Sequence, residues 1–208
     1  MTTTAAVAPT PRPLLTVEEY RARERRSDVR HEYVDGRAYA MSGDSRTHNR
    51  IVGNVFTRLF AAARGGPCRV SVEAVRVIAG DREYYPDVMV ACEPPPDDPY
   101  IETAPCVLVE VLSPSTRNTD RREKGPAYRA LPSLQMYLIV DQPHRRVEWY
   151  TRAADGSWFV TDLVGNGTVT FPCPPGPDGA PLTMTFDEIY EGVEPPPPRP
   201  PRRGRALG

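Results

Sequence analysis

Two acidic residues lie where the sequence is otherwise apolar, and their positions indicate what chemistry to look for. Glu110 is in the middle of the run CVLVEVL, and Asp87 directly precedes the apolar residues of the run YYPDVMV. A carboxylate buried in a sheet is costly unless it is protonated, paired or bound to a metal ion. The sequence therefore predicts a partner for Glu110, whereas Asp87 alone is equally typical of a residue that begins a strand after a turn.

The alternation of side chains along a strand places Glu110 on one face with Leu108 and Leu112. If the strand that follows Asp87 pairs with the strand that carries Glu110, the carboxylates of Asp87 and Glu110 lie on the same face of the sheet. Two carboxylates so close repel each other unless one is protonated or a cation lies between them. Oxygen ligands with open water positions suit Mg²⁺ or Mn²⁺, and a nearby lysine would position a water or polarise the scissile group.

The elements that must position these acids follow from local patterns. Thr16 is a predicted helix cap, and Asp35-Gly36 is the preferred turn of a two-residue hairpin. We expect helices over residues 47–64, after Pro114 and near 186–190, strands over 68–80, 84–92, 106–112, 134–141, 146–152 and 157–164, and a loop over 93–105. This order predicts an α/β or α+β domain with a central mixed sheet flanked by helices.

Composition sets the limits of the domain. The 208 residues include 25 prolines, many of them near the two ends. We expect disordered proline-rich tails over residues 1–13 and 194–208, and one folded domain over 14–193. The net charge of -1 argues against a wholly basic nucleic-acid-binding surface, although it leaves room for a local basic cleft. No apolar run is long enough to span a membrane, and the first residues do not resemble a signal peptide.

The four cysteines, Cys68, Cys92, Cys106 and Cys173, are scattered and form no CxxC pair. This spacing favours neither a zinc site nor a disulfide framework. We therefore expect reduced thiols in a cytoplasmic protein.

Several motifs together resemble a known family. Pro86-Asp87 followed by Glu110 in an apolar strand is similar to the signature of the PD-(D/E)XK nucleases. More specifically, the runs HEYVDG, THNRIVG, YYPDVMV, VLVEVLSPST, D...K...Y and MYLIVD resemble the Uma-two family of predicted restriction endonucleases. The resemblance implies a restriction-endonuclease-like fold, a DNA substrate and a Mg²⁺ or Mn²⁺ cofactor.

The resemblance also implies roles for individual residues. Asp87 and Glu110 become the metal carboxylates. The nuclease signature has a lysine where this chain has Leu112, and the family resembled here lacks it too, so Lys124 on the following helix is the candidate replacement. Asp120 and Lys124 share a helical face, but Gly125-Pro126 interrupts that helix and leaves the direction of Lys124 open.

Other readings of these residues stay open at this point. Lys124 is as well explained by a solvated pair with Asp120 as by catalysis. Glu32 matches a family position and could reach the metal from the hairpin, or it could be a strand-surface residue. His48 also matches a family position. Because it lies at the start of a predicted helix, a capping or packing role explains it better than proton transfer does.

The main hypothesis is a metal-dependent DNA endonuclease with Asp87, Glu110, Lys124 and Glu32 as its site residues. Two alternatives are a catalytically degenerate binding module of the same fold, and a hydrolase that acts on something other than DNA. A homodimer would suit the cutting of two strands, by analogy with the fold.

Overall fold

The strand that carries Glu110 lies inside a six-stranded sheet with the order β11-β10-β9-β8-β6-β3. Its strands are β3 (Arg69–Val72), β6 (Val88–Ala91), β8 (Pro105–Leu112), β9 (Met136–Asp141), β10 (Arg146–Arg152) and β11 (Trp158–Val164). β8 runs antiparallel to β6 and parallel to β9, so the sheet is mixed. The structure is a computed structural model that describes residues 13–41, 43–113, 119–176 and 179–194.

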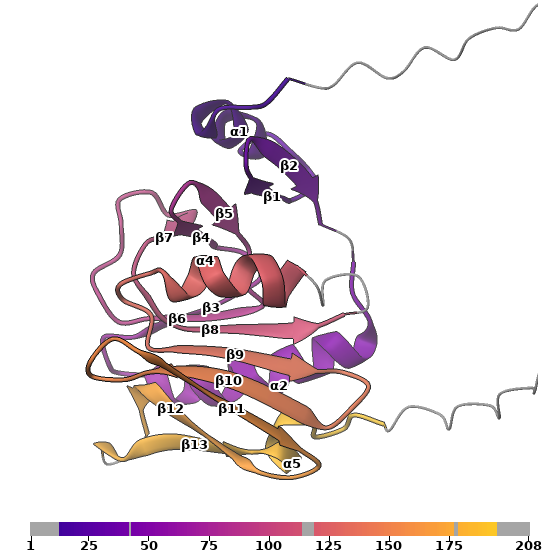
Figure 1. The fold of residues 1–208 in the computed structure, drawn as a ribbon, viewed down its shortest axis with the longest axis vertical. Coiled ribbons are helices and arrows are strands. Elements are labelled where there is room, and N and C mark those ends of the chain that lie inside the picture. The colour runs from indigo at the N-terminus through magenta and orange to yellow at the C-terminus, as the bar shows by residue number, and fades with distance from the viewer. Residues whose placement is uncertain (1–12, 42, 114–118, 177–178, 195–208) are drawn as a thin grey trace, which may run out of the picture.

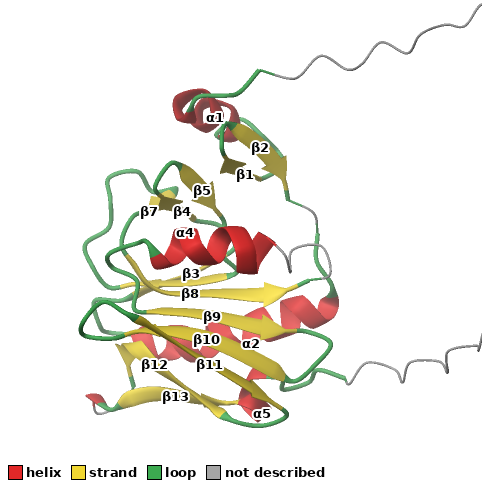
Figure 2. Ribbon diagram, in the orientation of Figure 1, coloured by secondary structure: helices red, strands yellow, loops and turns green. Residues whose placement is uncertain are grey.

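One face of this sheet packs against the long helix α2 (Arg46–Ala63), which lies along it in Figures 1 and 2. The helix begins after Ser45, whose hydroxyl oxygen accepts a hydrogen bond from the His48 backbone nitrogen. Ile51, Val55 and Leu59 recur at helical spacing and are fully buried in a cluster with the valines of β8.

The opposite face is covered by a short helical segment and by a second sheet. The segment consists of η1 (Asp120–Lys124) and α4 (Gly125–Arg129). The second sheet has the order β2-β1-β5-β4-β7. Its strands are β1 (His31–Val34), β2 (Arg37–Ala40), β4 (Arg76–Ala79), β5 (Arg82–Tyr84) and β7 (Ile101–Glu102). Leu108 and Leu112 of β8 pack on this side with Tyr84, Tyr128 and other apolar residues.

Helix α1 (Val17–Glu24), a two-stranded ribbon and helix α5 (Phe186–Ile189) complete the described fold. Helix α1 begins at the predicted cap Thr16, and the β1–β2 hairpin turns at Asp35 and Gly36, which both have positive φ. Strands β12 (Thr168–Pro175) and β13 (Pro181–Thr185) form the ribbon, which leads into α5. None of the helices in the described ranges is long and apolar enough to cross a membrane.

The predicted mixed sheet flanked by helices is confirmed, but two local predictions are wrong and one pair of strands was not predicted. Residues 68–80 do not form one strand, because the chain turns at Glu73, which has a φ of 48°, and β3 and β4 belong to different sheets. The expected loop over 93–105 contains β7, which pairs in parallel with β4. The proline-rich stretch that forms β12 and β13 was not predicted as strand. The start of the helix after Pro114 and almost all of the two tails lie outside the described residues.

The expectation of four separate thiols is also wrong. The structure pairs Cys68 with Cys92 and Cys106 with Cys173 as disulfides. Distance along the chain gave no sign of this pairing, because the cysteines are brought together by strand register and not by a local motif.

Candidate active site

The antiparallel register of β6 and β8 brings the two predicted carboxylates together. Val88 pairs with Val109, and the same register carried one residue further sets Asp87 opposite Glu110. Asp87 Oδ2 accepts a hydrogen bond of 2.6 Å from the backbone nitrogen of Val111, which fixes the carboxylate beside β8. Glu110 is 3% exposed, so the anomaly in the sequence is a buried acid in the structure.

Lys124 meets Glu110 from the helical segment. Its Nζ lies 3.1 Å from Glu110 Oε1, 2.8 Å from Glu32 Oε1 and 3.4 Å from Asp120 Oδ1. The hydroxyl of Tyr128 donates a second hydrogen bond, of 2.9 Å, to Glu110 Oε1. Lys124 is 4% exposed, which excludes the reading of a solvated surface lysine, although its pairing with Asp120 is real.

The interruption at Gly125-Pro126 gives the segment its shape. Pro126 has no backbone N–H, and the N–H of Gly125 donates to the carbonyl of Asp120, five residues back, which makes a π-helical turn. Such a turn is wider than an α-helical one and changes the direction of the side chains that it carries. Lys124 lies at its end and points at Glu110.

Glu32 reaches the same place from the hairpin. Besides its contact with Lys124, its Oε1 accepts a hydrogen bond from the backbone nitrogen of Tyr85, which lies two residues before Asp87. This is not the position of a plain strand-surface residue, because the Glu32 side chain is only 14% exposed. The family position that suggested Glu32 therefore lies in the cluster with Glu110 and Lys124.

His48 has a larger place in the site than its position at a helix start indicated. Its backbone is capped by Ser45 as expected, but its buried ring lies with Nε2 3.1 Å from Asp87 Oδ2. Burial alone would lower the pKa of His48, yet the hydrogen bond and the charge of Asp87 outweigh it and the pKa is raised. Glu73 is a further acid that the sequence did not indicate. His48, Glu73 and Asp87 each offer a ligand atom within 4.8 Å of the others.

The charges of the cluster explain what the arrangement can bind. Burial raises the pKa of Glu110 well above its usual value. Lys124 opposes this effect, while the nearby acids Asp120, Asp87 and Glu32 add to it. The pKa of Lys124 is raised in turn, because the carboxylates around it outweigh its burial. Among the described residues of this cluster, four carboxylates and the ammonium of Lys124 leave an excess of negative charge, and these oxygen donors fit a hard divalent cation. The four acids are Glu32, Asp87, Glu110 and Asp120.

A cavity of about 220 Å³ opens onto this cluster. Its lining comes from the β1–β2 hairpin, α2 and the residues before it, the residues before β6, and from β8 and η1. The charged and polar side chains in it include Glu32, Tyr39, Asp44, His48, Asp87, Glu110 and Lys124. The four predicted site residues thus line one cavity, although they come from four separate parts of the chain.

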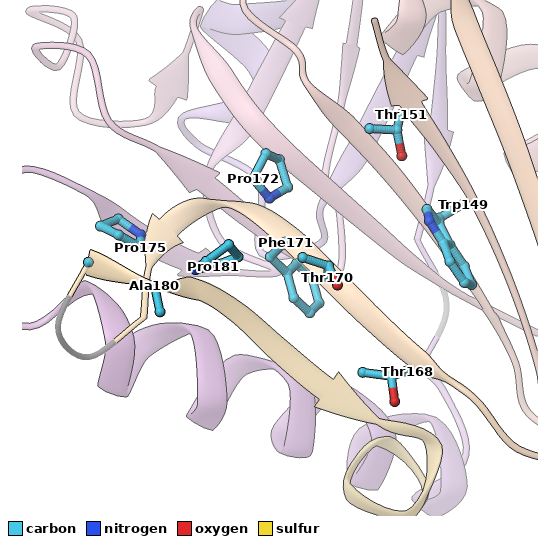
Figure 3. Close-up of a pocket in the computed structure, with 10 residues that line it drawn as sticks. Trp149, Thr151, Thr168, Thr170, Phe171, Pro172, Pro175, Ala180 and Pro181 are labelled. Atoms are coloured by element: carbon cyan, nitrogen blue, oxygen red, sulfur yellow. The ribbon is translucent and has the colours of Figure 1, made fainter.

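A larger cavity, of about 540 Å³, lies between β10 and the β12–β13 ribbon (Figure 3). Trp149, Phe171 and several prolines and threonines line it. Among the residues that the structure describes, none of the side chains that line it is an acid, a base or a thiol.

A solved crystal structure has the same arrangement of helices and strands. The structure matches the crystal structure of a protein from Anabaena variabilis described as "a putative nuclease belonging to DUF820", with a TM-score of 0.67 and 17% identity. The match covers 85% of this chain and 97% of that one, so the two share one fold.

Sequence comparison then identifies the family. A family model named Uma2 and described as "Putative restriction endonuclease" matches residues 17–185. The chain belongs to this family, as the resemblance predicted. Two uncharacterized proteins of Synechocystis sp. are 33% identical over 186 residues and 34% identical over 164 residues. These matches cover 88% and 76% of this chain, and 95% and 93% of the relatives.

Proposed function

We propose that the chain is an endonuclease that hydrolyses DNA phosphodiester bonds with Mg²⁺ or Mn²⁺. The observation that carries the proposal is the convergence of Asp87 and Glu110 at one end of β6 and β8, with Lys124 against Glu110. Membership of a family described as restriction endonucleases supports DNA as the substrate.

Asp87 and Glu110 would hold the metal ion, because they are the two acids of the cavity that opposite strands bring face to face. When bound, the ion would activate a water and stabilise the charge that develops on the phosphate. His48 and the backbone nitrogen of Val111 hold Asp87 in place through its Oδ2.

Lys124 would act as a donor and not as a base. Three carboxylates lie within 3.4 Å of its Nζ and hold it as an ammonium ion. From this position it orients Glu110 and presents positive charge to a phosphate or water in the cavity. Glu32 ties the ammonium to the hairpin, so it acts as a positioning residue.

Plasmid cleavage tests the proposal. The wild type is incubated with supercoiled DNA and Mg²⁺ or Mn²⁺, beside Asp87→Asn and Glu110→Gln, which keep the shape of each side chain. Because loss of residues that only support metal ligands costs 10–100-fold, each variant should cut at least about 100-fold more slowly. Asp162→Asn, which changes a surface acid of β11, is the control and should cut like the wild type. Equal cutting by all four proteins would refute the assignment.

One observation supports an alternative function, that of a binding module with the same fold. Leu112 stands where the nuclease signature has its lysine, as it would in a binding module that has lost turnover. Calorimetry with Mn²⁺ separates an intact metal site from a binding module that has lost turnover. Binding that Glu110→Gln abolishes indicates an intact metal site, and such binding without DNA cleavage indicates a hydrolase with another substrate. Absence of binding favours the module.

A second copy of the chain would place two such sites on the two strands of a duplex. The edge strand β11 exposes Phe159, Val160 and Val164, which supports a homodimer through this edge. Sedimentation of the wild type beside Val160→Lys tests this part of the proposal, since the charge should shift the protein to the monomer.

A further inference from the structure

The four cysteines of the chain gather at one place on the face of the larger sheet that α2 covers. Cys68 precedes β3, Cys92 follows β6, Cys106 lies on β8 and Cys173 lies on β12. Each is half-buried and packs against the same apolar cluster. Asp87 and Glu110 lie toward the other ends of β6 and β8, so the cysteines form a separate site.

The register of the strands builds half of this cysteine cluster. Arg69 of β3 pairs with Ala91 of β6, and one step further along the same ladder Cys68 lies opposite Cys92. Directly opposed residues on antiparallel strands point to the same face, so both sulfurs face the core.

Two irregularities build the other half. On β8, Val107 pairs with Val90 but Pro105 pairs with Ala91, which leaves Cys106 as the extra residue of a bulge. The register of β12 also shifts between Phe171 and Pro175, on either side of Cys173. A bulge redirects a side chain, and here both redirected side chains are cysteines that contact each other.

The two cysteine pairs lie against each other. Sγ of Cys92 is 3.5 Å from Sγ of Cys106, and the sulfurs of Cys92, Cys106 and Cys173 all lie within 4.8 Å of one another. Two disulfides that served only as independent staples would need no contact between pairs. A tetrahedral zinc site with bonds of about 2.3 Å has its sulfurs about 3.8 Å apart, which is close to the 3.5 Å between Cys92 and Cys106. Cys68 lies outside this group of three while it is bonded to Cys92, and reduction frees its sulfur to approach the other three.

We propose that, when its two disulfides are reduced, this cluster is a tetrathiolate site for a thiophilic divalent cation of the Zn²⁺ class. Two equivalents of a dithiol reduce the disulfides to four thiols and are themselves oxidised to disulfides. Binding of one Zn²⁺ then releases the four thiol protons, because thiolates are the ligands. The ion would clamp the β12–β13 ribbon to β3, β6 and β8. The inference does not rest on the proposed nuclease function.

Cobalt substitution tests the site directly. The full chain is reduced with dithiothreitol under anaerobic conditions, freed of small thiols and metals, and titrated with Co²⁺. We expect one equivalent to give sulfur-to-cobalt charge-transfer bands and the intense visible bands of tetrahedral cobalt, and one equivalent of Zn²⁺ to remove them. Zn²⁺ should also raise the midpoint of thermal unfolding of the reduced protein.

Two variants control the titration. Cys106→Ser/Cys173→Ser should lose the tetrathiolate spectrum, and Cys68→Ser serves if the double variant does not fold. Glu110→Gln should keep the spectrum, because it alters the carboxylate site alone. If the reduced, folded wild type has four titratable thiols and gives no sulfur-to-cobalt bands, the cluster is a pair of disulfides only and the proposal fails. Unchanged bands in the cysteine variants would overturn it equally.

Discussion

The ammonium nitrogen of Lys124 lies 3.1 Å from Oε1 of Glu110, although the two residues belong to separate elements, η1 and β8. Leu112, which stands at the lysine position of the nuclease signature, is fully buried in the apolar cluster on the same side of β8. In this chain the lysine near the buried acid therefore comes from a helical segment and not from the strand.

Removal of the ammonium should destabilise the protein. Lys124→Met keeps the length of the side chain but leaves Glu110, Glu32 and Asp120 without their shared cation. Because breaking a buried pair leaves uncompensated charge, we expect the free energy of unfolding to fall by about 3 kcal/mol or more, measured by urea denaturation. Arg121→Met in the same turn removes one partner of Glu148, whose carboxylate keeps a hydrogen bond from the Tyr150 hydroxyl, so the loss should be smaller than for Lys124→Met. Equal losses in the two variants would contradict the central role of Lys124.

Neutralisation of Glu110 should abolish nuclease activity without loss of stability. Glu110→Gln leaves Lys124 paired with Glu32 and Asp120 and removes one of four mutually repelling carboxylates. In metal-free buffer we expect its free energy of unfolding to match the wild type within about 1 kcal/mol, or to exceed it, while nuclease activity is lost. Urea denaturation and plasmid cleavage are measured on the same sample. A variant several kcal/mol less stable than the wild type would show that Glu110 has a mainly structural role.

Restoration of the signature lysine should fail. Leu112→Lys would bury a second ammonium among Leu108, Tyr128 and the rest of the apolar cluster, close to a lysine that already uses the available acids. We expect a loss of at least about 3 kcal/mol in stability and no gain in cleavage rate. Leu112→Met is the matched control and should cost less than about 1.5 kcal/mol. Faster cleavage by the lysine variant would indicate that the site lacks a lysine in the wild type.

A surface pair provides a pH test away from the site. Two hydrogen bonds from Arg146 lower the pKa of Asp162 on β11. A depressed carboxyl pKa stabilises the fold above the unfolded value near 3.9, and this contribution is lost as the pH falls through the folded value. Because the pair is exposed, Asp162→Asn should lose only about 0.2–1 kcal/mol at neutral pH. In urea titrations at a series of pH values, the difference should disappear in strong acid, and a difference that grows there would contradict the assignment.

The sequence by itself determined many of the local elements, and it singled out residues that the structure brings to one cavity. The period-two alternation of side chains placed Glu110 on a buried face of β8. The cap at Thr16 and the turn at Asp35-Gly36 set the ends of α1 and of the hairpin strands. Alternation, caps and turns depend only on neighbouring residues along the chain. The motifs around Asp87 and Glu110 were sufficient to predict the family and the fold.

Only the tertiary structure decided which distant residues meet. The π-helical turn that aims Lys124 at Glu110 depends on how the helical segment packs across the sheet, since the sequence showed only that Gly125-Pro126 would interrupt the helix. The ring of His48 reaches Asp87 from α2 for a similar reason. The four cysteines, Cys68, Cys92, Cys106 and Cys173, converge through strand register and two bulges. Register and bulges are set by pairing between segments far apart in the chain, and local periodicity carries no record of that pairing.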